Sequence, residues 1–242
     1  MEIFLQAETY VALLTLTFLE IVLGIDNIIF ISIATGKLPA KQQPRVRTIG
    51  MIMALVFRII LLTLITWIIQ LTEPLFTIGE TAFSVRDVIL LAGGIFLIWK
   101  SVTEIHQKTL AEHPEAHHKT KVSPGAVIFQ IILLDMVFSF DSILTAIGLS
   151  KQLIIMILAV VIAMIVMISF AGVISRFINE HPTLQILALA FLILIGFTLA
   201  LEAFHKEIPK GYVYVAVLFS FGVELINLRV RKTDDRRRKT DD

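Results

Sequence analysis

The sequence of 242 residues contains no cysteine. This absence excludes disulfide bonds and metal sites built from thiolates, although it says little about the compartment. Charged side chains are scarce as well, at 17% of the residues, whereas a soluble domain has about 25%. The first residues, MEIFLQAETY, hold acidic side chains and no basic one, so we expect no cleavable signal peptide. The composition is therefore not that of a soluble domain.

Hydrophobic residues make up 57% of the chain and give a mean hydropathy of +0.86. They gather in long apolar runs, which is typical of an all-α polytopic membrane protein. The lipid bilayer is thus the first expected partner, and no nucleic acid is expected. The runs predict seven transmembrane helices, at about residues 8–35, 46–71, 84–101, 123–147, 153–174, 182–201 and 211–228.

Local signals mark several boundaries of these helices. Ser84 and Asp87 have the spacing of a capping box, which predicts a helix start, and Ser123 followed by Pro124 predicts another. Residues 73–85 are predicted to form a loop. Residues 229–242 are basic and are predicted to form a disordered cytoplasmic tail.

The distribution of Lys and Arg predicts the orientation of the chain. Of the 21 Lys and Arg residues, 16 lie on the side reached after the first, third, fifth and seventh predicted helices, and four lie on the other side. Basic loops face the cytoplasm in membrane proteins. We therefore expect an external N-terminus and a cytoplasmic C-terminus, in the plasma membrane, which in a bacterial cell is the inner membrane.

Two acidic motifs interrupt the apolar runs. FLEIVLGIDNIIF holds Glu20 and Asp26, and LLDMVFSFDSIL holds Asp135 and Asp141, with the two acids of each motif six residues apart. A charged side chain at the centre of a membrane helix costs about 2.5–3.5 kcal/mol on the insertion scale. Four such acids in a repeated pattern indicate a functional site.

The two motifs also indicate an internal repeat. An offset of 115 residues aligns them position by position: Glu20 with Asp135, Gly24 with Ser139, Asp26 with Asp141, and Asn27 with Ser142. Each repeat holds three helices, an odd number, so the two copies must have opposite orientations. Many secondary transporters have such an inverted repeat, with the site between the copies.

The predicted organisation is therefore a 3+3 inverted repeat plus one extra C-terminal helix. It divides the chain into a membrane domain, 1–228, and a tail, 229–242, and within the membrane domain into repeat one at about 8–106, repeat two at about 123–205 and the extra helix at about 211–228.

The motifs LEIVLGIDN and LLDMVFSFDSI resemble those of the TerC family of integral membrane proteins, which was first associated with tellurium resistance. The resemblance covers nearly all seven predicted helices. It implies manganese efflux and metal homeostasis, and for some relatives it also allows a role in membrane-protein assembly or insertion, or in metal delivery. The family's functional positions carry over to six residues as candidate metal ligands: Glu20, Asp26, Asn27, Asp135, Asp141 and Ser142.

Helical spacing gives these residues a geometry. Positions i, i+4 and i+7 share a face, so one stripe contains Glu20, Gly24 and Asn27, and the equivalent stripe contains Asp135, Ser139 and Ser142. The second acid of each motif lies about 120° away on a regular helix. A helix break at Gly24 would turn the second acid of its motif inward.

Inversion would place the four acids as a ladder across the bilayer. In that ladder Glu20 and Asp135 are central, Asp26 lies toward the cytoplasm, and Asp141 lies toward the outside. We interpret the ladder as a cation path with a central site and two flanking steps.

The candidate ligands are all oxygens, which suit Mg²⁺, Mn²⁺ and Ca²⁺ and fit Cu(I) and Zn²⁺ badly. Only the family resemblance favours Mn²⁺ among them. Four acids exceed the charge of a divalent ion, so metal binding would release protons, and exchange of metal for protons follows. The alternative interpretation is that the acids merely form ion pairs with Arg58 and hydrogen bonds with helix hydroxyls.

Metal transport is thus the leading hypothesis, with no enzymatic activity and no resident cofactor expected. The role of an assembly factor is the second hypothesis. The sequence leaves open whether the chain forms a homo-oligomer. An intramembrane aspartyl protease is the third, since two helices each present an Asp, but the Gly-x-Gly-Asp motif is absent. Two further acids, Glu104 and Glu202, are predicted to be solvated at helix ends.

Overall fold

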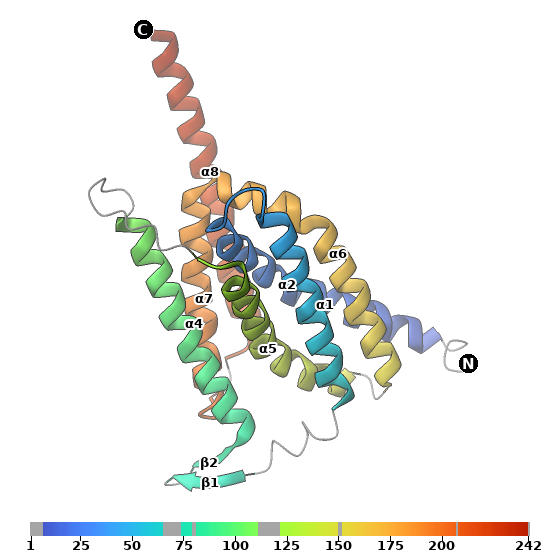
Figure 1. Cartoon of the computed structure of the whole chain (residues 1–242). Helices are drawn as coiled ribbons and strands as arrows, with labels where there is room; N and C mark the ends of the chain where they lie inside the picture. The colour runs from blue at the N-terminus through green and yellow to red at the C-terminus, as the bar shows by residue number, and fades with distance from the viewer. Residues whose placement is uncertain are drawn as a thin grey trace.

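The computed structural model describes residues 7–64, 74–78, 81–110, 122–149, 152–206 and 208–241. Within them the chain forms seven helices and one antiparallel pair of strands, so the prediction of a helical membrane protein is confirmed (Figure 1). The elements are α1 (Ala7–Gly36), α2 (Gln43–Thr63), β1 (Pro74–Ile78), β2 (Thr81–Ser84), α4 (Val85–Leu110), α5 (Pro124–Leu149), α6 (Leu153–Glu180), α7 (Pro182–Glu202) and α8 (Lys210–Asp241).

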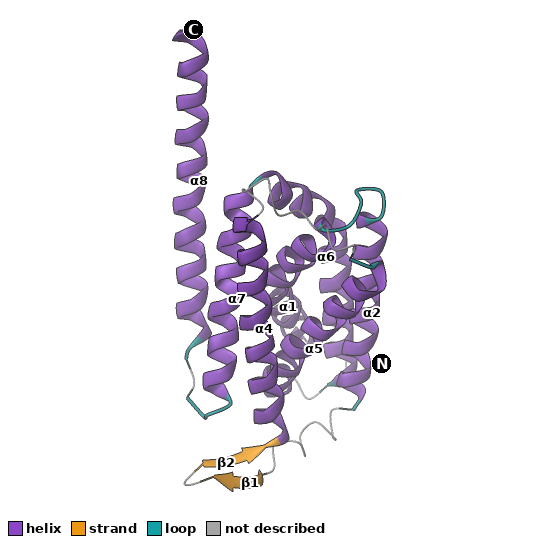
Figure 2. Ribbon diagram, turned by 60° about the vertical axis from the view of Figure 1, so that its left-hand side comes forward, coloured by secondary structure: helices purple, strands orange, loops and turns teal. Residues whose placement is uncertain are grey.

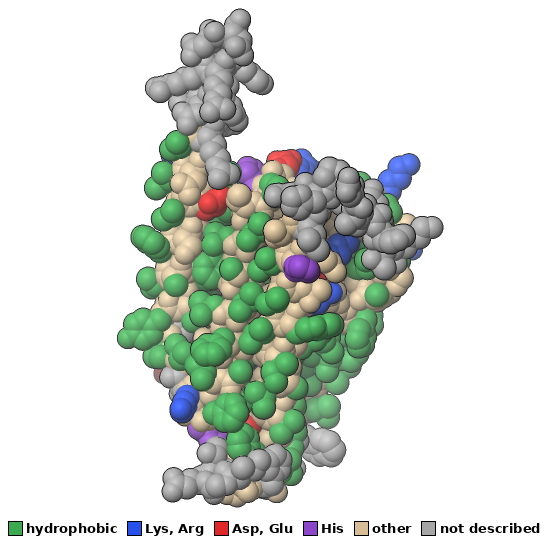
Figure 3. All heavy atoms as spheres, turned by 90° about the vertical axis from the view of Figure 1, so that its left-hand side faces the viewer, with side chains coloured by type: hydrophobic (Ala, Val, Ile, Leu, Met, Phe, Trp, Pro, Cys, Tyr) green, Lys and Arg blue, Asp and Glu red, His purple; other side chains and the backbone are tan. Residues whose placement is uncertain are grey.

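Six of these helices, α1, α2, α4, α6, α7 and α8, are long and apolar enough to cross a membrane. The remaining helix, α5, contributes a shorter apolar stretch, Pro124–Phe140, among the residues searched. Figure 3 shows hydrophobic side chains over the middle of one face of the molecule, with charged side chains mostly toward its two ends. Such a surface fits a molecule surrounded by lipid.

The helices pack in pairs. The closest pairs are α1 with α6, α4 with α7, and α2 with α5, and α1 also contacts α5 while α2 contacts α6. Thus α1, α2, α5 and α6 form one group of four helices. The pair α4 and α7 lies beside that group, and α8 packs mainly on α7 (Figure 2). The 3+3 inverted repeat itself stays a prediction.

Helices α4 and α7 touch through their backbones. A Cβ atom added at Gly94 would lie 2.5 Å from the carbonyl oxygen of Gly196, and one added at Gly196 would lie 2.7 Å from the carbonyl oxygen of Gly94. Only glycine permits this approach, which is a common way of bringing membrane helices together.

The helix starts agree well with the sequence signals. Ser84 and Asp87 form the predicted capping box: the amide and hydroxyl of Ser84 donate to the carboxylate of Asp87 at 2.8 and 2.7 Å, and the Asp87 amide donates to the Ser84 hydroxyl at 3.3 Å. Helix α5 begins at Pro124, with Ser123 bonded to the amide of Ala126.

Three predicted segments differ from the structure. The loop predicted at 73–85 contains the antiparallel pair β1–β2, in which Phe76 pairs with Phe83 and Ile78 with Thr81. Helix α2 ends at Thr63, because Leu64 leaves helical geometry (φ −85°, ψ 18°); the remainder of the predicted span lies outside the described residues. Helix α4 continues past residue 101 to Leu110, since its last turns pack on neighbouring helices through the contacts described below.

The tail prediction is also wrong for the described residues. Helix α8 continues to Asp241, although residues 229–242 are predicted to be disordered. The end of α8 and the loop between α1 and α2 lie at one end of the molecule, and the hairpin lies at the other (Figure 1).

Candidate functional site

The two motif helices meet at a single arginine. Glu20 of α1 and Asp135 of α5 lie on either side of Arg58 of α2, and all three side chains are buried. Arg58 itself is only 3% exposed. Helices α1, α2 and α5 thus build one polar centre inside a group of otherwise apolar helices.

Hydrogen bonds fix the geometry of this centre. The Nη1 of Arg58 donates to Oε2 of Glu20, its Nη2 donates to Oδ1 of Asp135 at 3.1 Å, and its Nε donates to the hydroxyl of Ser139 at 2.8 Å. The Ser139 hydroxyl in turn donates to Oδ2 of Asp135 at 3.1 Å. The guanidinium therefore holds three side chains from two helices, and none of these partners belongs to α2.

Asn27 is the last member of this centre, and one of its polar atoms has no hydrogen-bond partner. Its amide nitrogen lies 3.5 Å from Oδ1 of Asp135, and its carbonyl oxygen is buried with no hydrogen-bond partner. Buried polar atoms are nearly always bonded, so an unpartnered oxygen in a polar centre needs an explanation. A carbonyl oxygen is a good ligand for a hard cation.

The predicted stripes describe this arrangement well. Every residue of the two stripes is buried: Glu20, Gly24, Asn27, Asp135, Ser139 and Ser142. Ser142, although a candidate ligand, donates to the backbone carbonyl of Ser139 at 3.2 Å rather than to a carboxylate. Sequence reasoning named Ser139 only as a member of the stripe, and its direct link to Arg58 could not be read from spacing.

The helix break considered at Gly24 is not present. Helix α1 runs through this position without interruption. A Cβ atom at Gly24 would lie 2.3 Å from the sulfur of Met167 in α6. The glycine therefore serves close packing of α1 against α6 rather than a break in the helix.

The second acid of each motif is placed only by its backbone. Asp26 lies in α1 and Asp141 lies in α5, but their side chains are outside the part of the chain that the structure describes. The ladder of four acids consequently stays a prediction. Among the described residues, no group of three or more His, Asp or Glu side chains is arranged to hold a metal ion.

The charges of the centre do not cancel. Two carboxylates and one guanidinium leave one negative charge if all three are ionised. The described contacts include the ion pairs of the alternative interpretation, in which the acids serve only to hold Arg58. They also place two of the candidate ligands, Glu20 and Asp135, at one point inside the group of helices. A protease would need two aspartates that share a proton, and of the two acids described at this centre only Asp135 is an aspartate.

A second polar cluster lies at the end of α4, and here the sequence prediction is wrong. Glu104, predicted to be solvated, is 2% exposed and pairs with Lys37, which directly follows α1, and with Lys100 at 3.2 Å. Lys108 donates to the side-chain oxygen of Gln185 in α7. The longer α4 explains the error, because it keeps Glu104 inside the packed helices.

The opposite end of the same helices is also joined by charges. Arg86 of α4 pairs with Glu202 of α7, which is therefore not simply solvated as predicted. His205, in a left-handed backbone conformation (φ 57°), lies 3.3 Å from the carboxylate of Asp87. The ion pair between Arg86 and Glu202 thus links α4 and α7 at this end.

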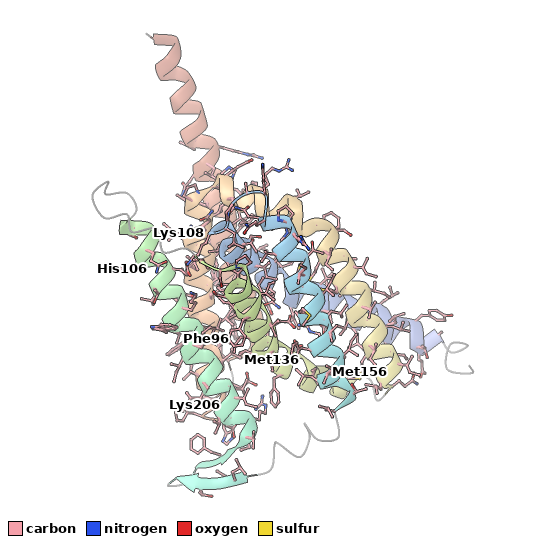
Figure 4. The ribbon with its side chains drawn as sticks, viewed as in Figure 1. Phe96, His106, Lys108, Met136, Met156 and Lys206 are labelled. Atoms are coloured by element: carbon pink, nitrogen blue, oxygen red, sulfur yellow. The ribbon has the colours of Figure 1, made fainter. Side chains whose placement is uncertain are left out.

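Figure 4 shows where the residue next to Asp135 in the chain lies. Met136, the residue after Asp135, lies on α5 between the levels of Lys108 and Lys206, which mark the two ends of the pair α4 and α7. The backbone beside Asp135 therefore lies between the two ends of α4 and α7, and the burial of Glu20, Arg58 and Asp135 places the centre in the interior.

Comparisons with known proteins agree with this architecture. A model of the family described as "Integral membrane protein TerC family" matches residues 5–239. The UPF0053 inner membrane protein YgdQ of Escherichia coli (strain K12) is 53% identical over 223 residues, covering 91% of this chain and 93% of that protein. A UPF0053 protein of Haemophilus influenzae is 50% identical over 226 residues, covering 93% of this chain and 95% of that protein.

A longer relative also matches the chain. The UPF0053 inner membrane protein YoaE of Escherichia coli (strain K12) is 45% identical over 241 residues, which cover 99% of this chain but only 46% of that protein. No solved structure matches the chain.

Proposed function

The chain belongs to the TerC family of integral membrane proteins, and from this premise we propose that it transports a divalent metal ion across the cytoplasmic membrane. The cargo that we propose is Mn²⁺, moved out of the cell in exchange for protons. No enzymatic step and no resident cofactor form part of the proposal.

One observation carries the proposal. Carboxylates from the two motif helices, Glu20 and Asp135, converge inside the group of four helices, and the unpartnered oxygen of Asn27 lies beside them. Acids inside a membrane protein usually mark an ion path or a proton relay. Carboxylate and carbonyl oxygens are the ligands that Mg²⁺, Ca²⁺ and Mn²⁺ prefer.

A purely structural ion pair is a weaker explanation. A buried salt bridge usually contributes little net stability, because the desolvation of both charges offsets their attraction. A comparable helix contact exists without any charge: Met167 of α6 packs on Gly24 of α1, whereas Arg58 of α2 bonds Ser139 of α5. Gly24 aligns with Ser139 in the predicted repeat, so the contact between α2 and α5 does not need an arginine for packing.

The helix pairs support an inverted repeat. If α1 corresponds to α5 and α2 to α6, then the pair α1 and α6 is the counterpart of the pair α5 and α2, and both pairs pack closely. Under the same correspondence α4 is the counterpart of α7. The axis that relates the two repeats would then pass through the contact between α4 and α7, at Gly94 and Gly196. In such folds the site lies between the copies and access alternates between the two sides.

The decisive experiment measures flux with purified protein in liposomes. Mn²⁺, Mg²⁺, Ca²⁺ and Zn²⁺ are supplied one at a time, with and without a pH gradient, and empty liposomes serve as the control. We expect flux of Mn²⁺ that a pH gradient accelerates and little flux of Zn²⁺. Lack of flux and of saturable binding for all four ions would contradict the proposal.

A further inference from the structure

The arginine of the centre occupies the place that a cation cargo needs. Three carboxylate oxygens already have donors: Oε2 of Glu20 is bonded by Arg58, Oδ1 of Asp135 by Arg58 and Asn27, and Oδ2 of Asp135 by Ser139. A metal ion bound by these oxygens would have to displace the guanidinium, because the two cations cannot occupy the same positions around the carboxylate oxygens. We propose that Arg58 is a resident cation that competes with the metal and replaces it when the site is empty.

Charge explains why such a replacement is useful. When both acids are ionised, the empty centre without an arginine would carry two negative charges, and closing it away from water would cost several kcal/mol per ion. With Arg58 in place, the centre carries one negative charge and each acid has a bonded counter-charge. With a divalent ion in place and Arg58 withdrawn, the two acids are neutralised. Arg58 therefore allows the empty site to close.

The asymmetry of the two helix contacts points the same way. Where the first contact has Arg58 against Ser139, the second has the thioether of Met167 against Gly24. The arginine centre, as far as the structure describes it, thus holds one guanidinium for two acids. A single mobile cation is what competition with a single divalent ion requires, whereas a purely structural role would be served equally well by apolar packing.

This inference rests on the proposed transport function. It predicts different effects on two kinds of flux, the exchange of metal for metal and net metal flux. Exchange of metal for metal never needs an empty site to close, so it does not need Arg58. Net flux requires the empty site to close and to open again on the first side of the membrane, so net flux needs Arg58. Loss of Arg58 should also tighten metal binding, because a charged competitor bonded to both acids is removed.

The test compares three variants of the full chain with the wild type. Arg58→Gln and Arg58→Met remove the charge, and the methionine copies the side chain found at the other contact. Arg58→Lys keeps the charge but loses the planar guanidinium, which bonds two acids and a hydroxyl at once. Arg47→Gln removes an arginine from the same helix, α2, away from the centre, and is the matched control.

Two measurements are made with Mn²⁺ as the probe. Equilibrium binding is measured in detergent, and in liposomes net uptake is compared with exchange against internal Mn²⁺. For Arg58→Gln and Arg58→Met we expect binding at least about tenfold tighter, exchange retained, and net flux at least about tenfold slower, as loss of charge-assisted hydrogen bonds would give. Arg58→Lys should be intermediate in all three, and Arg47→Gln should match the wild type.

The outcomes distinguish this inference from the proposed function. If the wild type neither binds nor moves any of the four ions, the proposed function fails and the inference fails with it. If the wild type transports Mn²⁺ but the neutral variants bind it no tighter, or lose exchange and net flux together, only the inference is overturned. If the neutral variants do not fold, Arg58→Lys decides, because unchanged binding and flux ratios in that variant would contradict competition.

Discussion

At the residue scale, the chemistry of the chain depends on how Glu20 and Asp135 share one guanidinium. Both acids are buried and both are bonded by Arg58. Their helices are far apart in the sequence, so the contact that both acids make with one arginine arises only when the two motif helices pack together. The consequences are best tested by changes that keep shape and remove charge.

Glu20→Gln and Asp135→Asn should each abolish metal transport. Each amide keeps the size of the side chain but removes a negative charge from the site, so metal affinity should fall by more than the 10–100-fold typical of a residue that only orients a ligand. Flux in liposomes gives the result, and size-exclusion chromatography checks that the variants stay folded. Near-normal flux in either variant would remove the central site.

Ser139→Ala should weaken metal binding without abolishing it. The Ser139 hydroxyl bonds both Arg58 and Asp135, so its loss should cost about 10–100-fold in affinity through misplacement of the carboxylate. Ser32→Ala is the matched control, because the buried Ser32 hydroxyl bonds only the carbonyl of Ile28 in its own helix, at 2.7 Å. Equal effects of the two substitutions on equilibrium binding would argue against a positioning role.

Metal affinity should fall as the pH is lowered, because protons and metal ions compete for the same carboxylates. The sign follows from the ligands: the acids must be ionised to bind the metal, so binding is strongest at higher pH and releases protons. Equilibrium binding measured across acidic and neutral pH, together with proton release on metal addition, checks this expectation. An affinity independent of pH would mean that amide and backbone oxygens bind the metal.

At the scale of elements, the pair α4 and α7 is built around a backbone contact. The two glycines at their crossing leave no room for a Cβ atom, and charged contacts join both ends of the pair: Lys108 with Gln185 at one, and Arg86 with Glu202 at the other. The group of four helices that holds the arginine centre makes fewer contacts with this pair than its members make among themselves. Two bodies of helices are thus apparent in the packing.

Gly94→Ala should destabilise the protein. Alanine favours a helix by about 1 kcal/mol over glycine, but overpacking typically costs about 1–3 kcal/mol, and here the added atom would meet the Gly196 carbonyl oxygen at 2.5 Å. Gly222→Ala in α8 is the matched control, since a Cβ atom there meets nothing within 4 Å. Thermal unfolding in detergent should show a lower Tm for the first variant and an unchanged or higher one for the second.

The elements also show what sequence can and cannot predict. Long apolar runs and the capping box at Ser84 and Asp87 identified the helices and one start directly, because each is a local property of the chain. The stripe of Glu20 and Asn27 followed from helical periodicity. The buried position of Glu104 did not, because it depends on Lys37, a residue distant in sequence. The pairing of Arg58 with both acids likewise depends on helix packing, which no spacing within α2 records.

At the scale of the whole molecule, the inverted repeat makes a sided prediction. Inversion would place Asp26 toward the cytoplasm and Asp141 toward the outside. Asp26→Asn should therefore chiefly raise the apparent KM for cytosolic metal, and Asp141→Asn should chiefly change release and external competition. A carboxylate attracts an ion most strongly where protein rather than water surrounds both.

Flux in vesicles of known orientation, with the metal varied on one face at a time, measures this asymmetry. Identical defects from both faces would mean that the two aspartates belong to one compact site. The same vesicles test the expected cytoplasmic C-terminus, because a protease added on the cytoplasmic face alone should then remove an epitope placed after α8.

Helix α8 has a consequence for how the molecule is assembled. It follows the other helices in the chain, packs mainly on α7, and leaves side chains such as Leu218 and Phe219 more than two-thirds exposed to the surroundings. The arginine centre and the contact between α4 and α7 are complete without it. During synthesis, when domains form from the N-terminal side first, the helices that precede α8 can consequently settle in the bilayer while α8 is still leaving the ribosome.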